Sequence, residues 1–266
     1  MSAYYNEHDK HAAAWLRELI RRDLIAPGDV DERSIEDVRP DDLRGYTQHH
    51  FFAGIGGWSY ALRLAGWPDD KPVWTGSCPC QPFSSAGQGA GLADERHLWP
   101  AFHHLIRERR PAIIFGEQVA HKRADPWFDL VQADLDGLGY AFGCVPFPSA
   151  GVGAPQLRDR AYWVADAHDA GPQGYGGAGW LSDTQMREVA AGYAAPRWLG
   201  ERIRDRAGNE RLIEPGTRPL ASRIPARVVR LRGYGNAVVA PAAQAFIESY
   251  LEVQNERVLA LQNNAG

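Results

Sequence analysis

The spacing of apolar and polar positions alternates between helical and extended periods over the first 165 residues. Residues 11–22 carry Ala, Leu and Ile at helical spacing, which predicts a helix. A short helix that Pro40 interrupts is expected over residues 34–43, with Ser34 as its N-cap. The remaining pattern predicts strands over 47–53, 73–75, 112–116, 140–147 and 161–165, and helices over 58–65, 96–109 and 127–137. Because strands alternate with helices, we expect an α/β fold with a doubly wound, mostly parallel sheet.

The regular alternation ends near residue 166. The following stretch combines a glycine-rich segment with scattered prolines, so we interpret it as a small irregular insert. Order resumes at Arg227 with a short strand, followed by a helix from Val238 to Leu251. The predicted division of the chain is residues 1–165 as an α/β domain, 166–226 as the insert and 227–266 as a C-terminal segment that returns to the first domain.

Composition excludes several classes of protein. The chain has 266 residues and only three cysteines, so a disulfide framework is excluded. No apolar run approaches the roughly 18 residues that a membrane span requires. The first residues show no basic segment followed by an apolar one, so we expect a cytoplasmic protein.

Positive charge is concentrated in one stretch of a chain whose formal net charge is −4. Between Arg187 and Arg232 there are eleven arginines, no lysine and five acidic residues. Arginine is planar, always charged and bidentate, which favours a surface that contacts phosphates. A solvated face is the simpler alternative.

A glycine-rich turn, Phe52-Ala-Gly-Ile-Gly-Gly57, follows the strand predicted at 47–53 and opens the next helix. Glycines at such a turn let the backbone approach a nucleotide-like ligand at the helix N-terminus. The turn lacks the G-x-G-x-x-G spacing of dinucleotide-binding enzymes, and by itself it is equally compatible with packing.

Two cysteines, Cys78 and Cys80, follow the strand predicted at 73–75. Loops at the carboxyl ends of parallel strands are where α/β enzymes hold reactive groups. A metal site is disfavoured because only Cys144 remains as a third thiol and the pair is too closely spaced. The flanking prolines and serines favour a shaped polar loop over a buried structural cysteine.

Glu117 follows the strand predicted at 112–116, and Gln156, Arg158 and Arg160 precede the strand at 161–165. A carboxyl group at the end of a buried strand is either structural or an acid whose pKa is tuned by burial. The other three side chains alternate, so on an extended segment they share one face and can clamp an anion or a base.

Taken in this order, the motifs resemble those of the cytosine-C5 DNA methyltransferase family. The turn at 52–57 is similar to the family's S-adenosylmethionine loop, Pro79-Cys80-Gln81 to its nucleophile motif, and Glu117-Gln118-Val119 to its Glu-Asn-Val motif. Gln156-x-Arg158-x-Arg160, Gly235-Asn236-Ala237-Val238 and residues 91–99 are similar to three further segments. The resemblance covers residues 51–165 and 233–247.

The resemblance implies a fold of the S-adenosylmethionine-dependent methyltransferase type and methyl transfer to C5 of a flipped-out cytosine in duplex DNA. Cys80 would add to C6 as a thiolate, because C5 by itself is too weak a nucleophile to take the methyl group. Glu117 would hold the base and protonate N3, while Arg158 and Arg160 would orient it and offset the growing negative charge. The scheme needs no metal.

The resemblance also implies the binding residues. Those for substrate are Pro79, Gln81, Ser84 and Gln156, and those for S-adenosylmethionine include Phe52, Gly54, Gly56, Gly57, Leu98, Asn236 and Val238. Duplex DNA is the implied partner. No membrane and no obligate protein partner is implied, and we expect a monomer.

One part of the cofactor site is missing from its usual place. The acidic ribose ligand is expected about 20 residues after the glycines, but Cys80 follows Gly57 by only 23 residues. Residues 3–8 and 28–31, on either side of the helix at 11–22, resemble the two missing motifs. We therefore predict that a strand–helix–strand unit within residues 1–45 has been relocated to precede the glycine turn.

On this prediction, Glu7 binds the ribose hydroxyls and Asp29 meets the adenine amino group. The alternative is that residues 1–45 are an unrelated acidic extension and that Asp69 or Asp70 binds the ribose.

Other departures leave further alternatives open. Gln118 replaces the family's Asn, His50 stands where an acidic residue is usual, and the target-recognition motif is not recognisable in residues 166–226. The chain could be a catalytically idle DNA-binding relic, although the intact Cys80 and Glu117 disfavour this, or it could act on RNA. A nucleotide-binding oxidoreductase is disfavoured by the glycine spacing.

Overall fold

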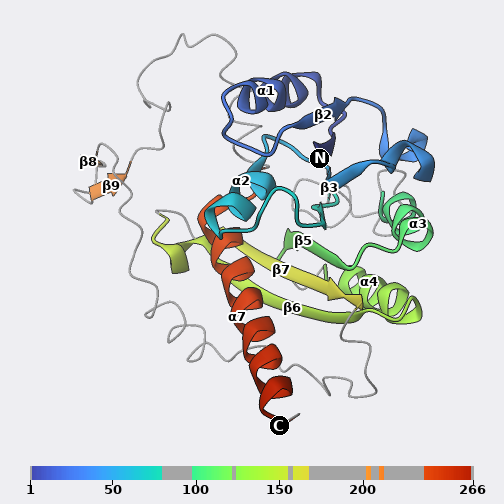
Figure 1. Ribbon diagram of the computed structural model, residues 1–266. Helices are drawn as coiled ribbons and strands as arrows, with labels where there is room; N and C mark the ends of the chain where they lie inside the picture. The colour runs from blue at the N-terminus through green and yellow to red at the C-terminus, as the bar shows by residue number, and fades with distance from the viewer. Residues whose placement is uncertain are drawn as a thin grey trace.

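The computed structural model describes residues 2–79, 98–121, 124–154, 158–167, 202–204, 210–212 and 237–264 (Figure 1). Seven strands form one sheet in the order β2-β1-β3-β4-β5-β7-β6. Their bounds are β1 Ser2–Asn6, β2 Gly28–Asp31, β3 Tyr46–Phe51, β4 Val73–Gly76, β5 Ile113–Val119, β6 Ala141–Pro148 and β7 Asp159–Asp166. The first five strands pair in parallel, whereas β7 lies antiparallel between β5 and β6.

Helices cover both faces of this sheet. Their bounds are α1 Lys10–Arg21, α2 Gly57–Leu64, α3 Trp99–Arg109, α4 Asp125–Gly137 and α7 Ala240–Asn264, with 3-10 helices η1 Ile35–Asp37, η2 Pro40–Leu43 and η5 Ser149–Val152. The helices α2 and α7 pack on one face of the sheet together, and α1 packs on the same face over β1. The helices α3 and α4 and the two first 3-10 helices pack on the other face (Figure 1).

Alternation along each strand explains the two-sided core. Tyr4 of β1 and Phe51 of β3 belong to the core beneath α3 and α4, whereas Tyr5 of β1 packs beneath α1. Successive side chains of a strand point to opposite faces, so a strand buried on both sides is apolar at nearly every position. The predicted α/β fold with a doubly wound, mostly parallel sheet is confirmed.

The N-terminal unit, residues 2–31, forms one side of the sheet, with β2 as the edge strand. The strand β1 pairs with β3 on one side and with β2 on the other, and all three run in parallel. Asp9 caps α1 by accepting hydrogen bonds from the backbone N–H groups of His11 and Ala12. The Tyr5 hydroxyl donates to the Ala26 carbonyl oxygen at 2.6 Å and lies 2.9 Å from the Ser59 hydroxyl of α2. Residues 2–31 are therefore tied to the element that follows the glycine turn.

One predicted element is wrong in kind. Residues 34–43 do not form a single helix but the two 3-10 helices η1 and η2. Ser34 does act as N-cap, yet Val38 and Arg39 both have extended backbone angles. Arg39 precedes Pro40, and the proline ring disfavours a helical conformation at the residue before it.

Other boundaries shift. The strand predicted at 112–116 continues to Val119, and the helix predicted at 238–251 begins at Ala240 and reaches Asn264. Most of the predicted insert and the short strand after Arg227 lie outside the described residues. Within the insert, β8 Arg202–Arg204 and β9 Glu210–Leu212 form an antiparallel pair. Among the described residues, no helix combines the length and the apolarity needed to cross a membrane.

Candidate active site

The strands β1, β3, β4 and β5 are neighbours and run in parallel, so their carboxyl ends lie on the same side of the sheet. The segments that leave this side begin with Glu7 after β1, Phe52 after β3 and Ser77 after β4. Glu117 lies within the last part of β5. Ligands of open α/β sheets bind beyond the carboxyl ends of the strands. The predicted site residues Glu7, Phe52 and Glu117 lie at this end of the sheet.

Glu7 joins the N-terminal unit to the glycine turn. One of its carboxylate oxygens accepts a hydrogen bond from the Gly54 backbone N–H at 2.6 Å, and the other accepts one from the Asp9 N–H at 2.8 Å. Burial raises the pKa of Glu7, and the two backbone donors oppose this by stabilising the charged form. A half-buried carboxylate thus lies directly against the turn, although 47 residues separate Glu7 from Gly54.

The glycines of the turn have different neighbours. Gly54 has φ +55°, and a Cβ placed on it would meet no atom closer than the Phe52 carbonyl oxygen at 4.0 Å. A Cβ on Gly56 would meet three side chains of the N-terminal unit at 3.3 Å, and one on Gly57 would meet Val238 at 3.1–3.2 Å. Only Gly54 of these three therefore has an open side that a ligand can approach, whereas Gly56 and Gly57 allow close packing.

Glu117 is 7% exposed and forms an ion pair with Arg160, whose Nε lies 2.6 Å from the Glu117 Oε1. Burial raises the pKa of Glu117, while the charges of Arg160 and Arg158 and a hydrogen bond from Ser77 lower it. Burial thus lets this carboxyl group keep its proton to a higher pH than an exposed one does, which suits it to proton donation.

Arg160 shares a face with Glu117, whereas Arg158 precedes β7 and has φ +31°, so it is not part of the extended segment. Arg160 lies opposite Val119, and Tyr162 lies opposite Glu117, in the antiparallel pairing of β7 with β5. Arg158 donates from Nη2 to the Ala237 carbonyl oxygen at 2.6 Å, across 79 residues of sequence. Residues 237–238 thus contact both Arg158 and the start of α2.

The loop after β4, which leads to Cys80, is held from two sides. Gln118 donates from Nε2 to the Cys78 carbonyl oxygen at 3.2 Å. The Trp58 indole N–H donates to the Ser77 hydroxyl oxygen at 3.0 Å. Pro79, the last described residue of the loop, is exposed. Gln118 therefore anchors the loop two residues before Cys80.

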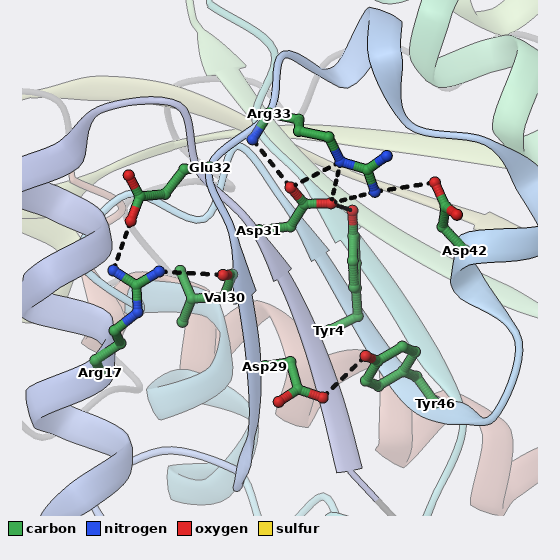
Figure 2. A pocket seen from close by; sticks show the side chains of 9 residues that line it. All are labelled: Tyr4, Arg17, Asp29, Val30, Asp31, Glu32, Arg33, Asp42 and Tyr46. Carbon is green, nitrogen blue, oxygen red and sulfur yellow. Dashed lines mark hydrogen bonds and ion pairs between the residues drawn. The ribbon is translucent and has the colours of Figure 1, made fainter.

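Among the described residues, no hydrogen bond or ion pair joins Asp29 to Glu7. Its carboxylate accepts a hydrogen bond from the Tyr46 hydroxyl at 2.9 Å, and Asp29 lies opposite Tyr4, two residues before the end of β2. Figure 2 shows both side chains in a pocket at the edge of the sheet. Asp31 is the residue at the end of β2, and its main-chain oxygen accepts a hydrogen bond from the Glu7 N–H at 2.9 Å.

The other side chains of this pocket are also paired. Asp31 accepts hydrogen bonds from the Tyr4 hydroxyl and from Arg33, and Arg33 also contacts Asp42 at 2.9 Å (Figure 2). Asp69, the alternative ribose ligand, forms an ion pair with Arg63 in the last turn of α2. Asp69 therefore lies beyond the end of α2 that is remote from the glycine turn.

Two further predicted cofactor residues lie against α3. Phe52 has φ +52° and contacts Phe102 edge to face, with ring centroids 6.0 Å apart. Leu98 is the N-cap residue of α3 and packs, half-buried, against the core. The predicted residues Cys80, Gln81, Ser84, Gln156 and Asn236 lie outside the described residues.

Sequence reasoning missed two residues near Glu117, Ser77 and Trp58. Ser77 was visible only as one of several polar residues in the cysteine loop, and Trp58 as an apolar helix position. Their contacts depend on which strands are neighbours, and no local pattern carries that information.

Comparisons with known proteins bear on this site. A family model described as "C-5 cytosine-specific DNA methylase" matches residues 67–189. Over these residues the chain is similar to this family. The matched span includes Cys80, Glu117 and Arg160, and it begins after the N-terminal unit and the glycine turn.

Relatives match over a similar region. The type II methyltransferase M.HhaI of Haemophilus parahaemolyticus is 27% identical over 111 residues, which cover 40% of this chain and 34% of that protein. The type II methyltransferase M.NgoMIV of Neisseria gonorrhoeae is 36% identical over 101 residues, which cover 36% of this chain and 32% of that protein. A solved DNMT2 mutant of Spodoptera frugiperda aligns with a TM-score of 0.42 at 15% identity, covering 62% of this chain and 42% of that one. The matched segments thus span about a third of the two methyltransferases.

Proposed function

We propose that this protein transfers a methyl group from S-adenosylmethionine to C5 of a cytosine in duplex DNA, with Cys80 as the covalent nucleophile. The observation that carries the proposal is the buried Glu117–Arg160 ion pair, which lies beside the loop that leads to Cys80. Both residues fall within the span that matches the C-5 cytosine-specific DNA methylase model.

The proposed chemistry uses the residues as follows. The Cys80 thiolate forms a bond to C6 of the cytosine, and the displaced electron pair makes C5 nucleophilic. Glu117 donates its proton to N3 as this adduct forms, and Arg160 balances the negative charge. Once C5 carries the methyl group, it loses its proton and the Cys80 sulfur leaves, which restores the aromatic ring. The target base leaves the helix to reach these groups.

The proposed cofactor site lies at Glu7 and the glycine turn. The open side of Gly54 would let the cofactor approach the backbone of the turn. The half-buried carboxylate of Glu7 would accept hydrogen bonds from the two hydroxyl groups of the ribose. S-adenosylmethionine, when bound, supplies an electrophilic methyl group on its sulfonium. Phe52, Leu98 and Val238 are proposed to complete the site, with Asn236. The role predicted for Asp29 at the adenine stays a prediction that its contact with Tyr46 does not support.

The test is methyl transfer from radiolabelled S-adenosylmethionine to unmethylated genomic DNA and, in a separate arm, to total RNA. We expect label in the DNA as 5-methylcytosine after digestion and chromatography. Label in RNA alone would replace DNA by RNA as the substrate. No label in either, from protein that binds S-adenosylhomocysteine, would contradict the proposed activity and favour a DNA-binding relic.

A further inference from the structure

A chain of hydrogen bonds connects the first turn of α2 to Glu117. Trp58 is the second residue of α2, is 4% exposed and stacks on Phe115 of β5, with ring centroids 6.1 Å apart. Its indole N–H donates to the Ser77 hydroxyl oxygen at 3.0 Å. Ser77 follows Gly76, which pairs with Gly116, so Ser77 lies beside Glu117, and a hydrogen bond from its hydroxyl lowers the pKa of Glu117.

The direction of this chain follows from the chemistry of its members. An indole N–H is a donor only, so the Ser77 oxygen must accept from Trp58. The hydroxyl proton of Ser77 is then available for a second acceptor, and the Glu117 carboxylate is an acceptor when ionised. Trp58 therefore sets the orientation of the Ser77 hydroxyl, and Ser77 donates to Glu117.

The other polar groups that face Glu117 come from β7 and its approach. Arg160 holds one carboxylate oxygen at 2.6 Å, and Arg158 contributes a second positive charge. Tyr162 lies opposite Glu117 in the strand pairing, and its buried hydroxyl has no hydrogen-bond partner among the described residues. Ser77 is thus the neutral donor to Glu117. It follows β4, on one side of β5, whereas the two arginines come from β7 and its approach on the other side.

We propose that Trp58 and Ser77 are positioning residues that orient Glu117 for proton transfer to the base and link its geometry to the glycine turn. The proposal rests on the proposed function of Glu117. The link to the turn arises because α2 begins at Gly57, directly after Gly54 and Gly56, and Trp58 is in its first turn. A shift of the turn is therefore transmitted through one side chain to Glu117.

The test measures single-turnover methyl transfer as a function of pH for Ser77→Ala, Ser77→Thr and Trp58→Phe. Ser77→Ala removes a donor to the carboxylate, so the pKa of Glu117 should rise. The pH above which the rate falls should then rise with it. We expect the maximal rate to fall roughly tenfold or more, with S-adenosylhomocysteine affinity unchanged. Ser77→Thr keeps the hydroxyl and should restore the profile.

Two comparisons separate positioning from general packing. Trp58→Phe should shift the profile in the same direction by less than Ser77→Ala, and should add nothing in the Ser77→Ala background. Trp67→Phe is the matched control, because Trp67 is equally buried on the same face but donates to the Lys71 carbonyl oxygen. Its pH profile should match that of the wild type.

Specific outcomes overturn the proposal. A wild-type pH profile in Ser77→Ala would do so, as would additive effects of Trp58→Phe and Ser77→Ala. Equal losses of cofactor affinity and rate in Ser77→Ala would make Ser77 merely structural. If Glu117→Gln is as active as the wild type, the proposed function of Glu117 itself is wrong. This result distinguishes a failure of the proposed function from a failure of the positioning role of Trp58 and Ser77.

Discussion

At the scale of single residues, the proposed chemistry depends on the carboxyl group of Glu117 and on the side chains that surround it. Glu117 is buried on a strand that is covered on both faces, and Arg160 supplies the compensating charge at 2.6 Å. A buried carboxylate without such a partner would be strongly destabilising. Arg160 therefore compensates the charge of a buried carboxyl group near the end of β5.

Glu117→Gln tests this role. The amide is nearly isosteric with the acid but cannot deliver a proton to N3, so we expect duplex affinity to persist while turnover falls roughly 10²- to 10⁴-fold. Binding is measured by fluorescence anisotropy and turnover by label transfer. Equal losses of affinity and rate would instead assign Glu117 a structural role.

Two buried histidines on β3 make stability depend on pH. His49 and His50 are 5% and 1% exposed, and burial lowers their pKa to about 4 and about 3, respectively. The unfolded chain therefore binds these protons at a higher pH than the native protein does. The native state keeps its full stability above about pH 6.5 and loses it as the pH falls toward those values.

We expect the free energy of unfolding to fall by roughly 1.4 kcal/mol per pH unit for each histidine between about pH 6 and pH 4.5. Denaturant titration over this range measures it. Changing His50, which hydrogen-bonds Thr75, to Gln should flatten the dependence, whereas the same change at the exposed His11 should not. An equally steep dependence in His50→Gln would contradict this assignment.

At the scale of elements, the N-terminal strand–helix–strand unit supplies the edge of the sheet beside the glycine turn. The contacts of Glu7 with Gly54 and of Tyr5 with Ser59 span 47 and 54 residues, so they exist only because β1 pairs with β3. A ligand site at the carboxyl ends of the strands depends on which strands are neighbours in the sheet. The order of these strands along the chain matters less.

Glu7→Ala should therefore weaken binding of S-adenosylhomocysteine by one to three orders of magnitude, since it removes charge-assisted hydrogen bonds to the ribose. Isothermal titration calorimetry measures the loss. The matched control is Asp69→Ala with Asp70→Ala, because Asp69 is paired with Arg63 far from the turn and should have little effect. A large loss in the double variant alone would reverse the assignment.

Sequence reasoning predicted the elements better than their contacts. The helix at 127–137 followed from periodicity, because it has one buried face. The strand at 73–75 followed from a short run of β-branched and aromatic residues that is buried on both faces. The two 3-10 helices were not predicted, because the polar, capped pattern of residues 34–43 is typical of one helix. Extended residues before Pro40 divide this segment in two. The Arg158–Ala237 hydrogen bond could not be predicted, since it depends on how distant segments return to the sheet.

At the scale of the whole molecule, the proposed DNA substrate is a polyanion, whereas the chain has a formal net charge of −4. The Arg-rich stretch between Arg187 and Arg232 concentrates positive charge in the region predicted to recognise the target. Each phosphate contact releases counterions, so affinity for DNA should fall steeply with salt.

Replacing Arg202, Arg204 and Arg206 together by Ala should reduce the slope of log affinity against log salt by roughly 2 to 3. The control is the pair Arg21→Ala and Arg22→Ala, because both arginines are exposed at the C-terminal end of α1 and already paired with Glu18. An unchanged slope in the triple variant would leave these arginines as a solvated surface.

The most direct measurement of the central claim is covalent trapping on duplex DNA that contains 5-fluorocytosine, with S-adenosylmethionine present. Fluorine at C5 cannot leave as a proton does, so the adduct between the enzyme and the base persists and can be digested and located by mass spectrometry. We expect a trapped complex through Cys80 in the wild type and in Cys78→Ala, and none in Cys80→Ser. A complex that forms in Cys80→Ser, or an adduct located on Cys78 or Cys144, would contradict the account.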